Sequence, residues 1–174
     1  MLDLALNHQE ELKKRFRETW FSSDYFFLSG TNYYEELIIV ESTWDWHQFV
    51  SLDSKGDIIG YISYSIDRSA YLVEGFEFIN FSDDKVTFGI DVAKVIKAIF
   101  EKFNFTKLNF SVIIDNPIEE DYDKLIEKYN GKIVGVQRNQ VRLYDGKLYD
   151  KKLYEILNED YKLYKEKKHE NCSI

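Results

Sequence analysis

Residues 86–117 constrain the fold of this chain more than any other segment. The centre of the segment repeats apolar side chains at the spacing of one helix face, at Val92, Ile96, Ile99 and Phe103. The run 107–114 that follows is short and rich in β-branched and aromatic residues, which predicts a buried strand. Another β-rich run, 71–81, precedes the segment, and a turn at Gly89 leads into the helix. This order predicts a βαβ crossover, whose helix N-terminus can offer backbone N–H groups to an anion.

The remainder of the chain predicts a single domain built around that crossover. The predicted strands are residues 47–52, 58–66, 71–81, 107–114, 132–143 and 148–157. The predicted helices are residues 8–21, 92–103 and 119–129, with a helical or irregular stretch at 22–41 that contains a turn at Gly30-Thr31-Asn32. A last helix is predicted in the tail from Asn158, where Tyr161 and Tyr164 have helical spacing. We divide the domain into an N-terminal helical region (1–44), a core (45–157) and a charged C-terminal tail (158–174).

Charge and residue usage narrow the class of protein. The net charge of −8 argues against a nucleic-acid partner, which would require Lys and Arg to neutralise phosphates, and it is compatible with an amine-bearing substrate. The single cysteine, Cys172, excludes an internal disulfide, and no signal peptide or membrane-spanning run is found. The three histidines have no metal-site spacing, so no metal is expected. We therefore expect a cytoplasmic protein without a membrane partner.

Four motifs in their order along the chain resemble the GCN5-related N-acetyltransferase (GNAT) superfamily. The resemblance covers roughly residues 45–157, and its last motif is similar to the closing hairpin of the subgroup that acts on ribosomal-protein N-termini and similar amines. The motifs are Gly60-Tyr61-Ile62-Ser63-Tyr64, the Gly89 turn, Asn116-Pro117 with Tyr122 six residues later, and Gly135, Arg138, Asp145 to Asp150 and Tyr154 to Leu157.

The resemblance implies an α/β fold with a mixed, mostly antiparallel central sheet, a splayed parallel strand pair and helices on both faces. Acetyl-CoA would enter the gap between the splayed strands, and its pantetheine arm would pair with one of them by imitating β-augmentation. Backbone amides at the turn and at the helix N-terminus would bind the pyrophosphate. The residues implied for pantetheine are Phe78, Ile79, Asn80 and Phe81, and those for pyrophosphate are Phe88, Gly89, Ile90 and Asp91.

The pyrophosphate fingerprint of the superfamily is degenerate in this chain. The usual pattern is Gln or Arg, two residues, Gly, one residue, then Gly or Ala, and of these marks only Gly89 is present. Val86 and Asp91 occupy the outer positions. A carboxylate at Asp91 would repel a diphosphate unless Lys85 or Lys94 offsets it. Alternatively, Asp91 belongs to the first helical turn and points to solvent.

Acetyl transfer to an amine needs a base and an acid, and the resemblance implies candidates for both. Tyr122 matches the tyrosine that protonates the departing thiolate, although it also fits a core stripe of its helix. Glu77 and Glu74 on the pantetheine strand are candidate bases, with Asp83 a remote third, and a solvated strand face is the alternative. Asn116 either binds the pantetheine or only begins the turn before Pro117.

The sequence thus leaves two functions open. One is an acetyl-CoA-dependent N-acetyltransferase in which the amine of a small molecule or peptide attacks the thioester directly. The other is a catalytically inactive GNAT-fold binding or regulatory protein. The exposed edge of a final strand offers a surface for a homodimer.

Overall fold

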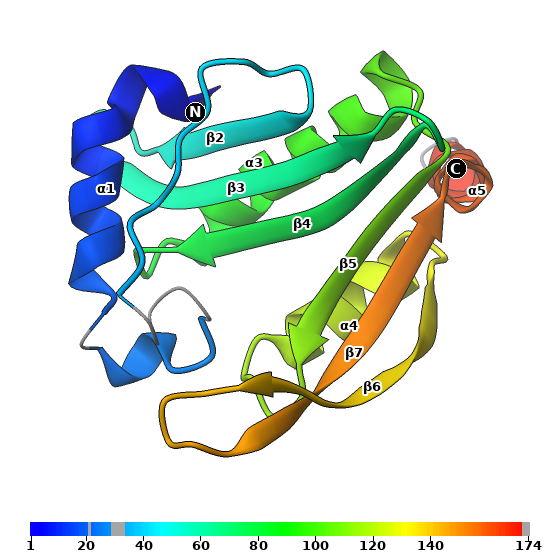
Figure 1. The fold of residues 1–174 in the computed structure, drawn as a ribbon. Helices are drawn as coiled ribbons and strands as arrows, with labels where there is room; N and C mark the ends of the chain where they lie inside the picture. Colours follow the sequence, from blue (N-terminus) through cyan, green and yellow to red (C-terminus); the bar gives the residue numbers. More distant parts are fainter. Residues whose placement is uncertain (21, 29–33, 172–174) are drawn as a thin grey trace.

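Seven strands form one mixed sheet in the order β1-β2-β3-β4-β5-β7-β6 (Figure 1). The structure is a computed structural model that describes residues 1–20, 22–28 and 34–171, so the turn predicted at Gly30-Thr31-Asn32 and Cys172 lie outside it. Within the described strands, only β4 and β5 pair in parallel. The strands are β1 (Leu2–Leu4), β2 (Trp46–Leu52), β3 (Ile58–Asp67), β4 (Leu72–Asn80), β5 (Lys107–Ile113), β6 (Lys132–Arg142) and β7 (Leu148–Leu157). This is the predicted mixed, mostly antiparallel sheet.

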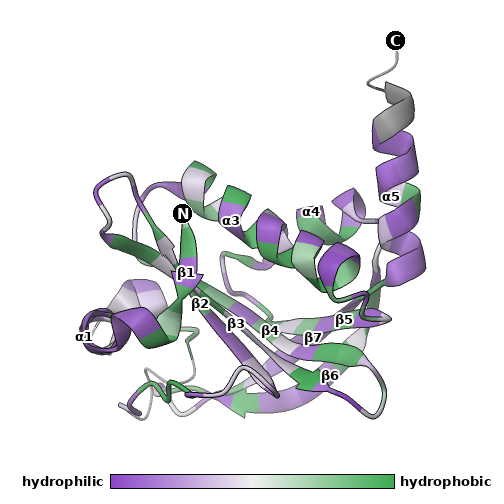
Figure 2. Ribbon diagram, turned by 90° about the horizontal axis from the view of Figure 1, so that it is seen from above, coloured by the Kyte–Doolittle hydropathy of each residue, from purple (hydrophilic) through white to green (hydrophobic). Residues whose placement is uncertain are grey.

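The helices lie on both faces of the sheet, as predicted. Figure 2 shows α3 and α4 on one side, α1 on the other, and α5 projecting from the body of the protein. The described helices are η1 (Ala5–His8), α1 (Gln9–Glu18), η2 (Ser23–Tyr25), α3 (Lys85–Lys97), η3 (Ala98–Lys102), α4 (Glu119–Lys128) and α5 (Asn158–Asn171). None of these helices has both the length and the apolar character needed to span a bilayer.

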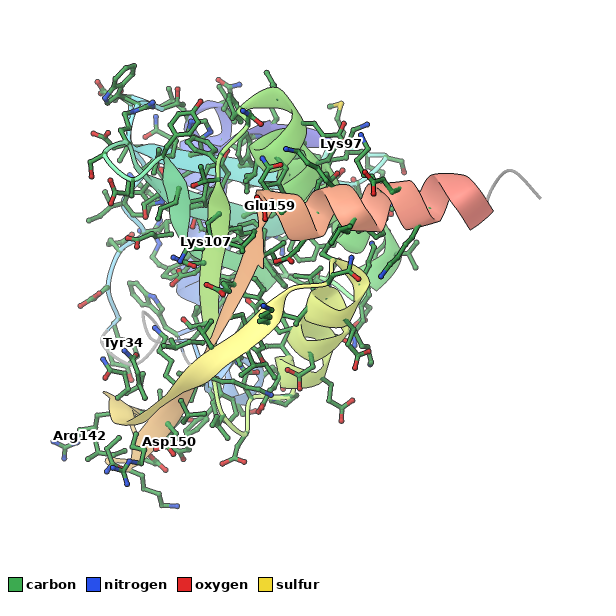
Figure 3. The ribbon with its side chains drawn as sticks, turned by 90° about the vertical axis from the view of Figure 1, so that its right-hand side faces the viewer. Tyr34, Lys97, Lys107, Arg142, Asp150 and Glu159 are labelled. Carbon is green, nitrogen blue, oxygen red and sulfur yellow. The ribbon has the colours of Figure 1, made fainter. Side chains whose placement is uncertain are left out.

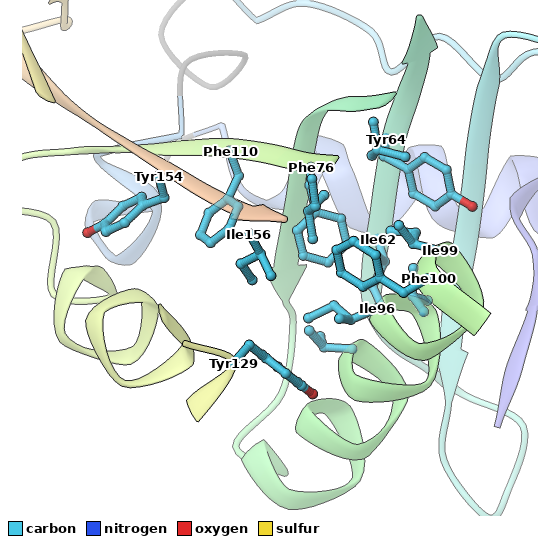
Figure 4. Close-up of a cluster of buried hydrophobic side chains, with 14 of the residues drawn as sticks. Ile62, Tyr64, Phe76, Ile96, Ile99, Phe100, Phe110, Tyr129, Tyr154 and Ile156 are labelled. Atoms are coloured by element: carbon cyan, nitrogen blue, oxygen red, sulfur yellow. The ribbon is translucent and has the colours of Figure 1, made fainter. Parts of the chain in front are cut away.

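The main hydrophobic core lies between the sheet and helices α3 and α4 (Figure 4). The apolar stripe of α3 packs onto β3 because Gly60 has no side chain: a Cβ there would lie 2.2 Å from the ring of Phe88. Such a contact is far inside van der Waals distance, so α3 can approach the sheet this closely only over glycine. Gly60 therefore fixes the position of the helix next to β4.

The opposite face of the sheet is covered at one end only. Leu12 of α1 packs with Val50 and Tyr61 in a smaller cluster, which Ile79 and Phe81 also join. On the same face of β5 and β7, by contrast, the side chains are mostly half-buried: Asn109, Ser111, Lys151, Leu153 and Glu155. Among the described helices only the short η2 and the residues after it reach this half of the face, which borders the gap between β4 and β5.

The structure corrects two sequence predictions of elements. The short strand β1 was not predicted, and it pairs with β2 at one end of the sheet. Helix α3 begins at Lys85, seven residues before the predicted start at Val92. The earlier start matters for the site, because it places Gly89 inside the helix and not in a turn before it.

Candidate active site

The gap between β4 and β5 is the centre of the candidate site. The two strands share one registered pair, Val73 with Leu108, although each continues for several residues beyond it. A bulge in β4 lies just after that pair, at Gly75, whose φ of +57° is the left-handed conformation that glycine adopts most readily. Beyond the bulge the strands diverge (Figure 1). The predicted splayed parallel pair is confirmed, and we call this gap the seam.

Two peptide groups of β4 face the seam. The N–H of Phe81 donates to the carbonyl of Ile59 in β3, at 2.8 Å. Since N–H and C=O point in opposite directions across a trans peptide, the carbonyl of Asn80 points away from β3 and into the seam. Backbone groups alternate in direction along an antiparallel strand, so the N–H and C=O of Phe78 also point away from β3 and into the seam. Ile79 and Phe81 are instead turned towards β3, so only two of the four implied pantetheine residues can offer backbone groups to the seam.

A tyrosine from the N-terminal region already uses one of these groups. The hydroxyl of Tyr25 in η2 donates to the carbonyl of Asn80 at 3.1 Å. A pantetheine amide would have to displace Tyr25 to reach this carbonyl. No pattern in the sequence marks Tyr25, which lies in an irregular stretch without periodicity.

Tyr122 on α4 lies beside the seam. Its ring packs 4.9 Å from that of Phe78 and 5.4 Å from that of Phe110, and the side chain is only 5% exposed. Its hydroxyl nevertheless makes no hydrogen bond to any described residue. Solvent still reaches that oxygen, because the only buried, unpartnered side-chain polar atom in the described chain is Nε1 of Trp20. Tyr122 is therefore both a core residue, as the alternative interpretation held, and the carrier of a free phenol.

Burial keeps this phenol protonated. Desolvation raises the pKa of Tyr122 well above its ordinary value, and the negative charge of Glu77 raises it further. A tyrosine in this state can donate a proton at neutral pH. Tyr122 also interacts electrostatically with the carboxylate of Glu77 on β4.

Glu77 lies on the face of β4 opposite Phe78. Solvent reaches its side chain, yet the surrounding protein desolvates the carboxylate enough to raise its pKa, an effect that the positive charge of Lys151 opposes. Glu74 lies next to Val73, where β4 and β5 are still paired, and its carbonyl accepts a hydrogen bond from Ser65 at 3.1 Å. The charge of Glu77 acts on Tyr122 from the opposite face of β4, whereas Glu74 lies at the closed end of the seam.

Asn116 forms the turn between β5 and α4. Its side-chain oxygen accepts a hydrogen bond from the N–H of Ile118 at 3.2 Å, and its carbonyl accepts one from Glu119 at 2.8 Å. These bonds start the helix that carries Tyr122. They fit the turn interpretation of Asn116, and its contact with pantetheine stays a prediction.

The start of α3 differs from the predicted pyrophosphate turn. Phe88, Gly89, Ile90 and Asp91 lie within the helix, where their backbone N–H groups face the preceding turn. The sequence-based placement of a turn at these residues is therefore wrong. The first-turn amides are capped by Asp84, whose carboxylate accepts a hydrogen bond from the N–H of Thr87 at 2.9 Å. The bonds from Thr87 hold the pKa of Asp84 below its usual value.

Asp91 points into the protein and not to solvent, which corrects the alternative prediction. Its side chain is 1% exposed and binds Nζ of Lys94 at 2.7 Å and the hydroxyl of Ser51 at 2.8 Å. The amino group of Met1 lies 3.2 Å from the same carboxylate. Burial alone would raise the pKa of Asp91, but these three partners hold it below its usual value. Of the two lysines predicted to offset the charge of Asp91, Lys85 and Lys94, it is Lys94 that binds it.

The N-terminal region and the final hairpin meet below the seam. The rings of Phe26 and Tyr144 lie 4.7 Å apart, and those of Phe27 and Tyr149 lie 6.0 Å apart. A hollow of about 230 Å³ opens beside this contact, lined by Ile114, Asp115, Lys147, Leu148, Tyr149 and Asp150. The resemblance to the GNAT superfamily implies that such elements form the substrate side of the site, and this stays a prediction. Among the described residues, no His, Cys, Asp or Glu side chains are grouped as a metal site would require.

Comparison with known proteins finds likeness in structure alone. No protein-family model and no curated protein sequence matches the chain. The spermidine/spermine N-acetyltransferase SpeG of Vibrio cholerae, crystallised with manganese ions, matches with a TM-score of 0.59 at 20% identity, over 68% of this chain and 69% of its own. A chimera of that SpeG with hSSAT matches with a TM-score of 0.64 at 18% identity, over 92% and 98% of the two chains.

A third structure matches over a similar length. It is a crystal structure of a protein assigned to the acetyltransferases, with a TM-score of 0.69 at 19% identity, over 94% of this chain and 88% of that one. The three likenesses each cover more than two thirds of this chain. The chain therefore has the fold of the GCN5-related N-acetyltransferases.

Proposed function

We propose that this protein is an acetyl-CoA-dependent N-acetyltransferase in which a substrate amine attacks the thioester directly. The observation that carries the proposal is the seam itself. It combines two peptide groups of β4 that face away from β3 with the free hydroxyl of Tyr122. A strand edge left open inside a sheet is unusual unless something pairs with it.

Each residue of the candidate site has a defined part in the proposed reaction, Phe78 and Asn80 through their backbone groups. Phe78 and Asn80 would pair with the pantetheine arm of acetyl-CoA, which supplies the activated acetyl group. Glu77 would accept a proton from the substrate ammonium, directly or through a water molecule, and its raised pKa brings its basicity closer to that task. The neutral amine would then attack the carbonyl carbon and form the C–N bond. As the C–S bond breaks, Tyr122 would donate a proton to the departing thiolate sulfur and would recover one from the nitrogen of the new amide.

A second candidate is a GNAT-fold binding protein without transfer activity. Two observations favour it. The first-turn amides of α3 are capped by Asp84, and the seam-facing carbonyl of Asn80 is bound by Tyr25. Both contacts occupy groups that the cofactor would use. In this alternative the scaffold persists while the diphosphate end of the site is closed.

Titration with acetyl-CoA separates the two candidates. A ligand at one hundred times its Kd stabilises the folded protein by about 2.7 kcal/mol, which a thermal melt detects. Stabilisation together with release of free CoA in the presence of a panel of amines supports the enzyme. Stabilisation with no release supports the binding protein, and no stabilisation at millimolar acetyl-CoA contradicts the proposed transferase.

A further inference from the structure

We propose that Lys151 binds an anionic group of the acceptor, so that the substrate is an amine that also carries a carboxylate or a phosphate. The inference rests on the proposed transferase function and specifies its substrate class. It starts from the position of Lys151 on β7, on the half of the sheet face that borders the seam.

The register of β7 determines which way Lys151 points. The next residue, Lys152, donates to Glu119 at 2.8 Å and to Asp123 at 2.9 Å, so it faces α4. Side chains alternate along a strand, and Lys151 therefore lies on the opposite face. Its cross-strand partner on β5 is Ile113, which is buried and shares that face. Lys151 thus stands on the same side of the sheet as Glu77.

Lys151 lacks the partner that comparable lysines have. Lys152 has two carboxylates, and Lys107, at the other end of the same strand pair, lies 3.4 Å from Glu155. Lys151 is half-buried as well, yet no described carboxylate lies within ion-pair distance of it. An ammonium on a half-buried side chain that has no counter-ion is available to bind the anion of a ligand.

The surroundings of Lys151 leave room for such a substrate. Glu77 and Lys151 influence each other electrostatically without forming an ion pair, so they stand apart across the seam. The hollow lined by Tyr149 and Asp115 adjoins Lys151 on β7. An acceptor whose ammonium meets Glu77 and whose anion meets Lys151 would span this distance. A polyamine has no group for Lys151 to bind.

Matched acceptor pairs test this inference. Each pair shares an amine and differs in the anion: 4-aminobutyrate against butylamine, and phosphoethanolamine against ethanolamine, with spermidine as a polycation. We expect the wild-type protein to acetylate at least one anionic member with a kcat/KM about tenfold or more above its neutral partner. The two pairs distinguish a carboxylate from a phosphate. Equal values within both pairs, or a preference for spermidine, would overturn the inference.

Two variants locate the preference. Lys151→Met should raise the KM for the anionic acceptor about tenfold relative to that for its neutral partner, because the anion contact is lost. Loss of the positive charge also raises the pKa of Glu77 for both acceptors, so the two are compared within each protein. Lys107→Met is the control. It removes the same charge from the same sheet face at the other end of the β5–β7 pair, and Figure 3 shows Lys107 far from Asp150, the neighbour of Lys151. This variant should preserve the preference. A preference that survives in Lys151→Met contradicts the assignment.

Binding of the acetylated products tests the role of Lys151 without requiring turnover. Calorimetric titration of the CoA-bound protein with N-acetyl-4-aminobutyrate and with N-butylacetamide should show tighter binding of the anionic product, and Lys151→Met should abolish the difference. Equal affinities in the wild-type protein would refute the role of Lys151. Failure of the proposed function is distinct, since it shows as an absence of acetyl-CoA binding.

Discussion

The two ends of the expected cofactor path differ sharply. At the seam, β4 and β5 separate after a single registered pair, and peptide groups of Phe78 and Asn80 face the gap. At the start of α3, the carboxylate of Asp84 takes the position that a bound anion would take at a helix N-terminus. One end of the path is open, and the other is closed by a side chain of the protein itself.

The difference shows that the scaffold and the anion site depend on different residues. The seam is held apart by packing: Phe110 stacks on Tyr154, and Tyr122 packs between Phe78 and Phe110. The helix N-terminus depends on one capping residue, which can change without affecting the core. A GNAT fold can therefore persist whether or not the diphosphate end is accessible.

The largest expected effect tests the open end. Glu77→Gln should lower kcat by about a hundredfold or more, in the range of a lost general base. In the wild-type protein the rate should fall as the pH drops through the pKa of Glu77, which lies above the ordinary value for glutamate. The variant should lose this acid limb of the pH–rate profile.

Glu74→Gln serves as the control for this prediction. It makes the same substitution on the same strand at the closed end of the seam, and we expect an unchanged profile. A larger loss in Glu74→Gln than in Glu77→Gln would show that the seam is not where the chemistry occurs.

A smaller effect is expected at Tyr122. Tyr122→Phe removes only the hydroxyl, which makes no hydrogen bond to any part of the chain that the structure describes, so the core should be preserved. Loss of a general acid predicts a fall in kcat of roughly tenfold to a hundredfold with the Kd of acetyl-CoA unchanged. Stopped-flow transfer assays and calorimetry measure the two quantities. If kcat is unaffected, the phenol only fills the core.

Much of the scaffold was accessible from the sequence, because it follows from hydrophobic periodicity. The strands of the final hairpin and the βαβ crossover have strong patterns, and the crossover predicted a parallel strand pair. That this pair is splayed was implied by the resemblance to the GNAT superfamily. The start of α3 could have been placed better: Phe88 continues the apolar stripe one turn before Val92, and Asp84 precedes it at N-cap spacing. Glycine at 89 suggested a turn because it is a poor helix former, but packing of the helix on the sheet outweighed that preference.

Other features of the site could not be read from local patterns. Tyr25 reaches Asn80 across 55 residues of sequence, and nothing in its irregular segment marks that contact. Burial of Asp91 depends on partners from β2 and from the first residue. The environment of Lys151 follows from register, since its neighbour Lys152 has the same charge and faces α4 instead. Long-range contacts of this kind require the fold.

The third prediction concerns the closed end. Asp84→Asn keeps an effective helix cap and removes the negative charge. If a diphosphate binds near the start of α3, relief of the like-charge repulsion should tighten acetyl-CoA about fivefold, and the gain should shrink at high salt. Asp83→Asn removes the same charge from the adjacent exposed position without altering the cap, and its effect should be smaller. Equal Kd values for all three proteins would mean that the diphosphate binds elsewhere.

The smallest effect distinguishes a helical Gly89 from a phosphate-binding one. Gly89 lies inside α3, and a Cβ built there meets no atom within 4 Å. Gly89→Ala should therefore stabilise the protein by about 0.5–1 kcal/mol, because alanine loses less backbone entropy in a helix. Denaturant unfolding measures this gain, and acetyl-CoA affinity should not change. If Gly89→Ala instead weakens acetyl-CoA binding, the backbone at 89 must approach the cofactor closely, and the start of α3 must rearrange when the cofactor binds.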